Sequence, residues 1–180
     1  MRVIGGAARG RALRAPPGRV TRPTLDRVRE AVFDILGSLG GVDGSTVADL
    51  FAGSGALGIE ALSRGARQVT FVEVGRQALV AIRENLRTTG FEGEQSHVVK
   101  ADVLHFLDRP HFFDVVFADP PYEYGGWEKL LSKLECGVAV LEAGEPIDVP
   151  PRWEVARRKR YGDTLVIVIR PASSAVEARQ

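Results

Sequence analysis

Two patterns of hydrophobic and polar positions alternate along the chain. Short apolar runs typical of buried strands are separated by segments whose apolar residues recur every three or four positions, as on one face of a helix. The strand-like runs are 46–51, 68–74, 96–101, 112–118 and 137–142, and the helix-like segments between them are 56–64, 76–88, 103–107 and 126–134. Parallel strands need crossover connections, so this alternation predicts an α/β, doubly wound, mostly parallel sheet with helices on both faces.

Both ends of the chain depart from this alternation. Strand-like segments 153–159 and 165–170 flank a turn at 161–163, which predicts a C-terminal antiparallel hairpin at the sheet edge. Segments 2–4 and 11–14 are separated by glycines and predict a small N-terminal β-hairpin arm. A helix is predicted to follow, with Thr24 as its N-cap and the glycines at 40 and 41 as its end.

Composition narrows the class of protein. The chain has 180 residues, of which 44% are hydrophobic and 26% charged, and this excludes a disordered, collagen-like or disulfide-scaffold chain. Cys136 is the only cysteine, so an intramolecular disulfide is excluded and a thiolate zinc site is disfavoured. Because no apolar stretch is long enough to span a membrane and the arginine-rich start lacks the apolar core of a secretory signal, we expect a cytoplasmic protein.

The net charge of +1 is unevenly distributed along the chain. Residues 1–29 hold eight arginines and one acid, a net charge of +7, which leaves −6 for the remainder. A second basic cluster lies at 152–160. Arginine suits phosphate and base contacts, so the arm favours a polyanionic partner. A solvated basic tail would show the same pattern, so charge alone leaves nucleic-acid binding open.

A glycine-rich motif joins the first predicted strand to the following helix. Residues 49–58 read DLFAGSGALG, with glycines where a ligand must approach the backbone closely. Glu73 ends the next strand, where an acid can bind a ribose. These features suit a dinucleotide or S-adenosylmethionine (SAM). Asp49 favours SAM, because a carboxylate beside the loop would repel a pyrophosphate but attract the sulfonium and ammonium groups. Asp102 follows the third strand, placed either to reach an adenine amino group or to cap the next helix.

A second motif, Asp119-Pro120-Pro121-Tyr122, follows the strand at 112–118, beside the expected cofactor crevice. The prolines stiffen the loop and remove two hydrogen-bond donors. The Asp119 carboxylate and the Pro120 carbonyl would accept from an exocyclic aromatic amine and favour a tetrahedral nitrogen whose lone pair points at the SAM methyl group. Tyr122 would stack on the base. Such an in-line displacement depends on positioning and needs no metal.

Together these motifs resemble a known family. DLFAGSGALGIEALSRGA and DPPY, behind the openings RVIGGAARGRAL and RPTLDRVREAVFDIL, are similar to the RsmD-type 16S ribosomal RNA guanine-N2 methyltransferases from Arg2 to about Glu142. The resemblance implies a seven-stranded, Rossmann-like SAM-dependent methyltransferase fold and methylation of a guanine amino group in the small-subunit RNA. Residues 144–151 depart from many SAM folds, because they leave no room for a helix before the last hairpin.

The residues predicted to act fall into three groups. The SAM site comprises Asp49, Phe51, Ala52, Gly53, Ser54, Gly55, Glu73, Val74, Asp102 and Val103. The catalytic residues are Asp119, Pro120, Pro121 and Tyr122. The RNA contacts are Arg9, Arg11, Arg14, Arg22 and Arg29, of which the last two are alternatively structural anchors or part of the base pocket. No metal site is expected, because His97, His105 and His111 lack metal-ligand spacing, and Trp127 and Trp153 are expected in the core.

We therefore expect a basic arm over residues 1–22 and a methyltransferase domain over 23–180, forming a monomer that acts on ribosomal RNA or the small ribosomal subunit and has no membrane partner. Two alternatives share parts of the pattern. A DNA adenine-N6 or cytosine-N4 methyltransferase would carry the same DPPY motif. A ribosome-assembly factor could bind RNA with little turnover, although the intact glycine loop and DPPY disfavour it.

Overall fold

The computed structural model describes residues 1–16 and 23–173. Within these residues the helices are α1 (Pro23–Ser38), α2 (Ala56–Ser63), α3 (Arg76–Thr89), α4 (Val103–Phe106) and α5 (Trp127–Lys133). The strands are β1 (Thr46–Leu50), β2 (Gln68–Glu73), β3 (Ser96–Lys100), β4 (Phe113–Ala118), β5 (Cys136–Ala143), β6 (Trp153–Tyr161) and β7 (Thr164–Pro171). The bounds of the strands and helices predicted from residue 24 onward differ from these by at most two residues, whereas the segments 2–4 and 11–14 form no strand.

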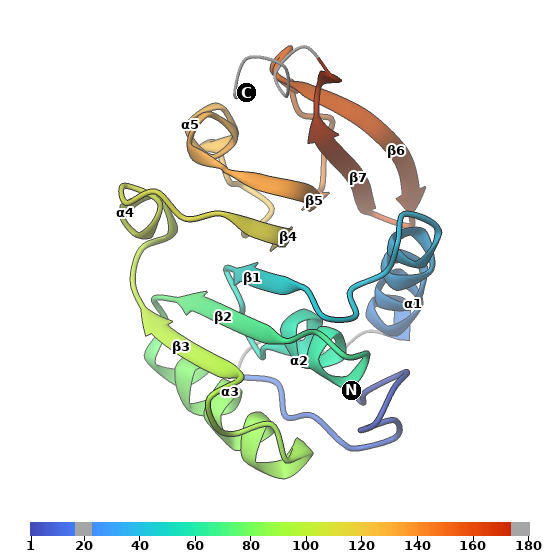
Figure 1. Cartoon of the computed structure of the whole chain (residues 1–180), viewed down its shortest axis with the longest axis vertical. Helices are drawn as coiled ribbons and strands as arrows, with labels where there is room; N and C mark the ends of the chain where they lie inside the picture. The colour runs from blue at the N-terminus through green and yellow to red at the C-terminus, as the bar shows by residue number, and fades with distance from the viewer. Residues whose placement is uncertain (17–22, 174–180) are drawn as a thin grey trace.

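The seven strands form one mixed sheet in the order β3-β2-β1-β4-β5-β7-β6 (Figure 1). The first five strands are parallel, and β7 runs antiparallel to both β5 and β6. This confirms the doubly wound α/β fold and the C-terminal hairpin. The second strand of the hairpin joins the sheet and the first strand forms its edge. No helix lies between β5 and β6, as the short segment 144–151 led us to expect.

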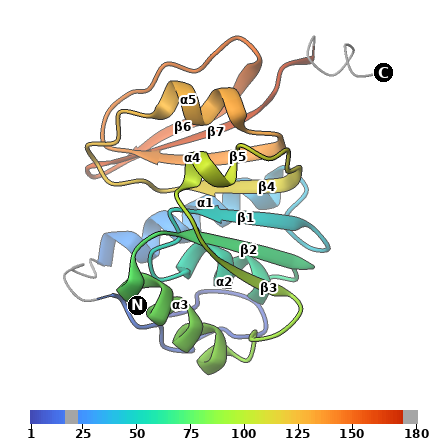
Figure 2. The same ribbon diagram turned by 90° about the vertical axis from the view of Figure 1, so that its left-hand side faces the viewer.

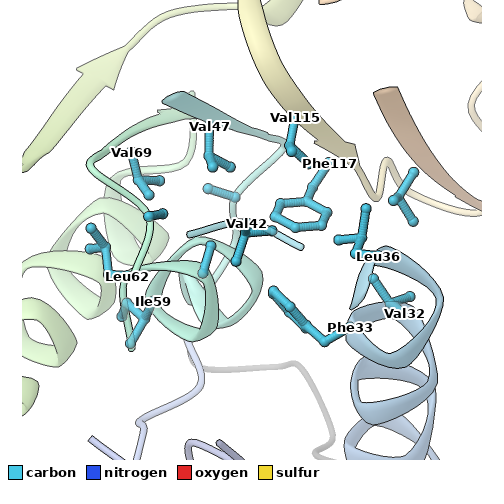
Figure 3. Packing of buried hydrophobic residues seen from close by; sticks show 14 of the residues in the cluster. Val32, Phe33, Leu36, Val42, Val47, Ile59, Leu62, Val69, Val115 and Phe117 are labelled. Atoms are coloured by element: carbon cyan, nitrogen blue, oxygen red, sulfur yellow. The ribbon is translucent and has the colours of Figure 1, made fainter. Parts of the chain in front are cut away.

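Alternate strand residues build two apolar layers. One face packs against α1, α2 and α3, and Figure 3 shows Phe33 of α1 beside Phe117 of β4, with ring centroids 5.5 Å apart. The other face packs against α4 and α5. Figure 2 shows α4 and α5 on the near side of the sheet and α1 and α2 on the far side. Helices on both faces explain why the central strands read as continuous apolar runs.

Helix α1 begins at Pro23, so Thr24 lies inside its first turn and is not its N-cap as predicted. Proline is favourable at the first helical position, because its fixed φ suits the helix and the missing N–H would have had no partner inside the helix. The position of the cap was therefore wrong by at least two residues, while the helix itself is confirmed.

The N-terminal segment, residues 1–16, packs along α2 and α3. The predicted hairpin is reduced to one isolated antiparallel bridge between Arg2 and Ala12, because the backbone of the segment bonds to side chains of the neighbouring helices. The segment is fastened by its backbone to side chains of the two helices, namely Glu60, Ser63 and Asn85. Val3, Ala8 and Leu13 are buried in the core. The approach is close, because a Cβ atom at Gly6 would lie 1.7 Å from the carbonyl oxygen of Ser63.

Candidate active site

The carboxyl ends of β1, β4 and β5 bring three carboxyl groups together. Asp49 pairs with Phe117, and Ala118 pairs with Leu141, so Asp119 and Glu142 follow at the next level of neighbouring strands. Because side chains alternate along a strand, all three acids point to the face that carries α1. They line one cleft of about 450 Å³.

This cleft unites residues from both predicted motifs. Of the predicted residues, those that line it are Asp49, Phe51, Ala52, Ser54, Asp119, Pro120, Pro121, Tyr122 and Arg29. The remaining wall was not predicted and comprises Met1, Ala15, Pro16, Ala56, Leu57, Trp127, Glu142, Ala143, Gly144 and Thr164. The glycine loop and the DPPY loop therefore face the same space, as expected at the carboxyl ends of parallel strands.

The glycine loop is tightly wound by left-handed backbone. Gly53 and Gly55 have backbone φ angles of +58° and +76°, which residues other than glycine rarely adopt. Phe51 also has positive φ, at +60°, and its ring packs edge-on against Tyr124 with 5.1 Å between ring centroids. A strained non-glycine residue held by packing is common at functional sites.

Glu73 holds this loop in place. One carboxylate oxygen accepts the N–H of Gly53 at 2.9 Å, and the other accepts the N–H groups of Val74 and Gly75 at 2.8 and 2.7 Å. Glu73 is outside the cleft lining but is bonded directly to the loop that forms it. Its role at a ribose stays a prediction.

Asp49 is a buried acid whose charge the protein alone does little to stabilise. Its side chain is 2% exposed, and Oδ2 accepts the N–H of Gly58 at 2.9 Å. Burial raises its pKa from 3.8 to about 8 against the opposing effect of that hydrogen bond, and the charges of Asp119 and Glu73 raise it further. A cation bound in the cleft would favour the ionised form.

Glu142 is a second buried acid, and sequence reasoning missed it. Its side chain is 8% exposed, and no described residue forms a hydrogen bond with its carboxyl group. Burial, followed by the charges of Asp119 and Asp49, raises its pKa well above the ordinary value, while Arg29 lowers it. The feature of the sequence that could have identified Glu142 is an acidic residue at the end of the fifth strand, on the same sheet face as Asp119.

The DPPY loop forms part of the wall of the cleft, in addition to carrying the predicted hydrogen-bond acceptors. The Tyr122 side chain is 67% exposed, and its hydroxyl lies 3.4 Å from Oγ1 of Thr164. A Cβ atom at Gly144 would lie 2.6 Å from the Tyr122 ring, so glycine lets the ring lie close to the backbone. The ring thus stands at the cleft, available for stacking on a planar ligand.

Aromatic rings pack behind this loop. Tyr124 packs edge-on against Trp127, with 5.4 Å between ring centroids, and the buried Tyr124 hydroxyl has no hydrogen-bond partner among the described residues. Trp127 is half-buried against the core and also lines the cleft. Trp153 is buried, and its indole N–H donates to the Leu131 carbonyl at 3.1 Å, which confirms its predicted core position.

Apart from Glu73 and the loop glycines Gly53 and Gly55, three predicted cofactor residues lie outside the cleft lining, namely Val74, Asp102 and Val103. Asp102 caps α4 by accepting the N–H of His105 at 3.1 Å, so the capping alternative is correct. Val103 is buried and Val74 is exposed. Contact of these three residues with a cofactor stays a prediction.

The predicted RNA-contacting arginines differ in environment. Arg9 is exposed, Arg11 donates to the Thr88 carbonyl at 2.9 Å, and exposed Arg14 pairs with Glu84 at 3.3 Å. Arg29 is 4% exposed and donates to the Arg2 carbonyl and to Asp26, which fits the anchor alternative, and it also lines the cleft, as the pocket alternative requires. The last of the five, Arg22, lies outside the described residues.

In the part of the chain that the structure describes, no group of three or more His, Cys, Asp and Glu side chains is arranged to hold a metal ion. None of the described helices has the length and apolar character to cross a membrane.

Relatives match almost the whole chain. A family model described as Conserved hypothetical protein 95 matches residues 1–170. Ribosomal RNA small subunit methyltransferase D of Haemophilus influenzae is 37% identical over 175 residues, which cover 90% of this chain and 89% of the relative. The Escherichia coli K12 protein of the same name is 36% identical over 176 residues, which cover 90% and 85%.

Solved structures share the fold. Escherichia coli yhhF has a TM-score of 0.83 at 33% identity, over 95% of this chain and 97% of that chain. SMU.776, solved in complex with SAH, has a TM-score of 0.68 at 15% identity, over 83% of this chain and 50% of that chain. At that identity the likeness is one of fold.

Proposed function

Because the chain belongs to the family described as Conserved hypothetical protein 95, that of the RsmD-type methyltransferases, we propose that it transfers a methyl group from SAM to the N2 amine of a guanine in 16S ribosomal RNA. The observation that carries the proposal is the meeting, in one cleft, of the glycine loop and the DPPY loop. The relatives' names supply the RNA substrate. The proposal includes that the protein is cytoplasmic and acts as a monomer.

The cleft fits a cationic cofactor better than a phosphate-bearing one. Asp49 is buried beside the glycine loop, and Asp119 lines the same space. A pyrophosphate would add negative charge to this group, whereas the ammonium and sulfonium charges of SAM would offset it. In the proposal, Asp49 faces the amino-acid end, Glu73 the ribose and Asp102 the adenine. Bound SAM supplies an electrophilic methyl group.

The DPPY loop would activate the nucleophile. The carboxylate of Asp119 and the carbonyl of Pro120 accept hydrogen bonds from the two N–H groups of the target amine, which frees the nitrogen lone pair for attack. Tyr122 stacks on the base. The methylated nitrogen then loses one proton, and Asp119 is placed to accept it. These interactions strengthen as the nitrogen becomes tetrahedral, so they raise the rate and not only the affinity.

The N-terminal segment would hold the RNA. Arg9, Arg11 and Arg14 are exposed, on a segment that also contributes Met1, Ala15 and Pro16 to the cleft. Arg11 donates to the Thr88 carbonyl at the C-terminal end of α3, so phosphates bound there would lie along this surface, away from the carboxyl ends of the strands where the cleft opens. In this proposal residues 1–22 contact RNA and residues 23–180 form the methyltransferase domain.

One experiment tests the proposal. The protein is incubated with radiolabelled SAM and, in separate reactions, with 16S ribosomal RNA, with 30S particles and with duplex DNA, each from cells lacking the enzyme. After digestion, label in N2-methylguanosine from RNA or particles is expected. Label in N6-methyladenine or N4-methylcytosine from DNA would replace the proposal by the DNA alternative. RNA binding without label in any sample would identify a binding factor.

A further inference from the structure

Glu142 is a carboxyl group in the cleft that the proposed mechanism does not use. Its side chain is more than nine-tenths buried, it lines the cleft, and no described residue forms a hydrogen bond with it. Its carboxyl oxygens are not among the buried atoms without a partner in the described residues, so they stay accessible from the cleft. The carboxyl group of Glu142 can therefore form hydrogen bonds with a ligand bound in the cleft.

The position of Glu142 relative to the reacting group follows from strand register. Because Ala118 pairs with Leu141, the next residues, Asp119 just after the end of β4 and Glu142 within β5, come at the same level of neighbouring strands, and the charge of Asp119 acts on Glu142. The glycine loop extends from β1, on the other side of β4. The order across the sheet is therefore cofactor loop, Asp119, Glu142. A base whose amine is held at Asp119 has room for the rest of its edge beside Glu142.

The surroundings of Glu142 favour its neutral form. Among the described residues, the charged groups acting on it are Asp119, Asp49 and the cation Arg29. That guanidinium is already shared with Asp26, with the Arg2 carbonyl and with Glu60. Burial and the two nearby acids together raise the pKa of Glu142. A neutral carboxyl group presents one O–H donor and one carbonyl acceptor side by side.

We propose that Glu142 is a specificity-determining residue that reads the O6 and N1–H groups of the target guanine. This inference rests on the proposed function and deepens it. The Watson–Crick edge of guanine presents an acceptor, a donor and the reacting amine in that order. The Glu142 carboxyl group donates to O6 and accepts from N1–H, while Asp119 and the Pro120 carbonyl hold the amine.

The same arrangement discriminates against the other bases that carry an amine. In adenine and in cytosine the ring nitrogen beside the amine is an acceptor, so Glu142 forms at most one of its two hydrogen bonds. A pocket that leaves a buried polar group unpaired with the wrong ligand rejects that ligand. Asp119 thus serves the chemistry common to amino methylation, and Glu142 selects the base.

The test compares guanine with 2-aminopurine at the target position of the substrate that the wild-type protein methylates. 2-Aminopurine keeps the reacting amine but lacks O6 and has an acceptor at N1. We measure kcat/KM on both substrates for wild type, Glu142→Gln and Glu142→Ala, with SAM affinity and melting temperature as controls. Glu145→Ala removes an exposed acid three residues away and serves as the matched control.

Wild type and Glu145→Ala are expected to prefer guanine by about 10- to 100-fold, the effect of one or two buried hydrogen bonds. Glu142→Gln keeps the preference, because its amide copies the donor and acceptor of a neutral carboxyl group. In Glu142→Ala the preference shrinks to within a few-fold, with SAM affinity unchanged.

An unchanged preference in Glu142→Ala overturns the inference. Equal loss in Glu142→Gln and Glu142→Ala also overturns it, and the nearly isosteric Glu142→Gln decides the matter if the alanine variant does not fold. If wild type methylates no guanine, the proposed function itself fails and this inference falls with it. Methylation of guanine without any dependence on residue 142 would remove only this inference.

Discussion

The guanidinium group of Arg29 and the carboxylate of Glu60 meet in the interior beneath the N-terminal segment, with 3.8 Å between Nε and Oε2. Their side chains are 4% and 0% exposed. Glu60 also accepts the backbone N–H groups of Ile4 and Gly5 at 2.7 Å, and Arg29 donates to the Arg2 carbonyl. The pair therefore joins the N-terminal segment to α1 and α2.

Replacing Arg29 by methionine should destabilise the fold. Glu60 would stay buried with Arg64 as its remaining cationic side chain, and breaking a buried ion pair costs about 3 kcal/mol or more. Urea unfolding measures the change, and Arg27→Met, an exposed arginine of the same helix, should change stability by less than about 0.5 kcal/mol. Normal stability in Arg29→Met with weakened RNA binding would show that Arg29 contacts RNA and is not an anchor.

Asp49 should make the ligand-free protein less stable as pH rises. Its pKa is 3.8 ordinarily and about 8 in the fold, so between these values the folded state binds more protons than the unfolded state. The free energy of unfolding contributed by this group then falls with increasing pH up to about 8. Asp49→Asn keeps an acceptor for Gly58 and removes the titration. Its stability relative to wild type, from urea unfolding at pH 5, 6.5 and 8, should increase with pH, and a constant difference would contradict the assignment.

Glu73 should be needed for cofactor binding. Calorimetry should show saturable heat for SAM and none for NAD. Glu73→Ala loses both the expected ribose contact and the three N–H groups it accepts from the loop, so SAM affinity should fall by about 10-fold or more. Glu92→Ala, a change at an exposed acid, is the control. Saturable NAD binding without SAM binding would refute the methyltransferase proposal.

Asp119→Ala should separate chemistry from cofactor binding. If the carboxylate acts mainly in the transition state, kcat falls by about 100-fold or more while SAM affinity is unchanged. Asp119→Asn should retain more activity, because its carbonyl still accepts a hydrogen bond. Single-turnover methylation with saturating SAM provides the rate. Wild-type kcat in Asp119→Ala would remove the catalytic role.

Neutralising Arg9, Arg11 and Arg14 together should weaken RNA binding and reduce its salt dependence. Each lost phosphate contact lowers the log–log slope against salt by about 0.7 to 0.9. SAM affinity should stay unchanged, which separates lost RNA contacts from a folding defect. Replacing Arg109 and Lys129, exposed residues beside α4 and on α5, should leave the slope unaltered. An unaltered slope in the triple variant would refute the role of the N-terminal segment.

Sequence reasoning was most successful where local pattern determines structure. Continuous apolar runs and segments of helical period located the strands and helices from residue 23 to residue 171, because burial on both faces of a parallel sheet leaves a continuous apolar signal. The glycine and DPPY motifs were placed at strand ends, and the structure brings both to one cleft. Their individual roles depend on ligands and stay predictions.

What the sequence did not reveal depends on contacts between distant residues. Glu142 looks like any acid at a strand end, and only the pairing of β4 with β5 places it beside Asp119. Arg29 belongs to an arginine-rich stretch and is distinguished by burial against Glu60, 31 positions away. The insertion of β7 between β5 and β6 likewise follows from sheet order and from no local motif.

The long separation between the N-terminal segment and its partners also sets an order of events during synthesis. Residues 4–14 bind side chains 55 to 71 positions further along the chain. At about 5–20 residues per second, a ribosome needs several seconds to make those partners. Until then Arg9, Arg11 and Arg14 belong to an undocked nascent strand, and Met1, Ala15 and Pro16 cannot take their places in the cleft. The N-terminal segment, although synthesised first, can therefore complete the wall of the cleft only after α2 and α3 have been synthesised.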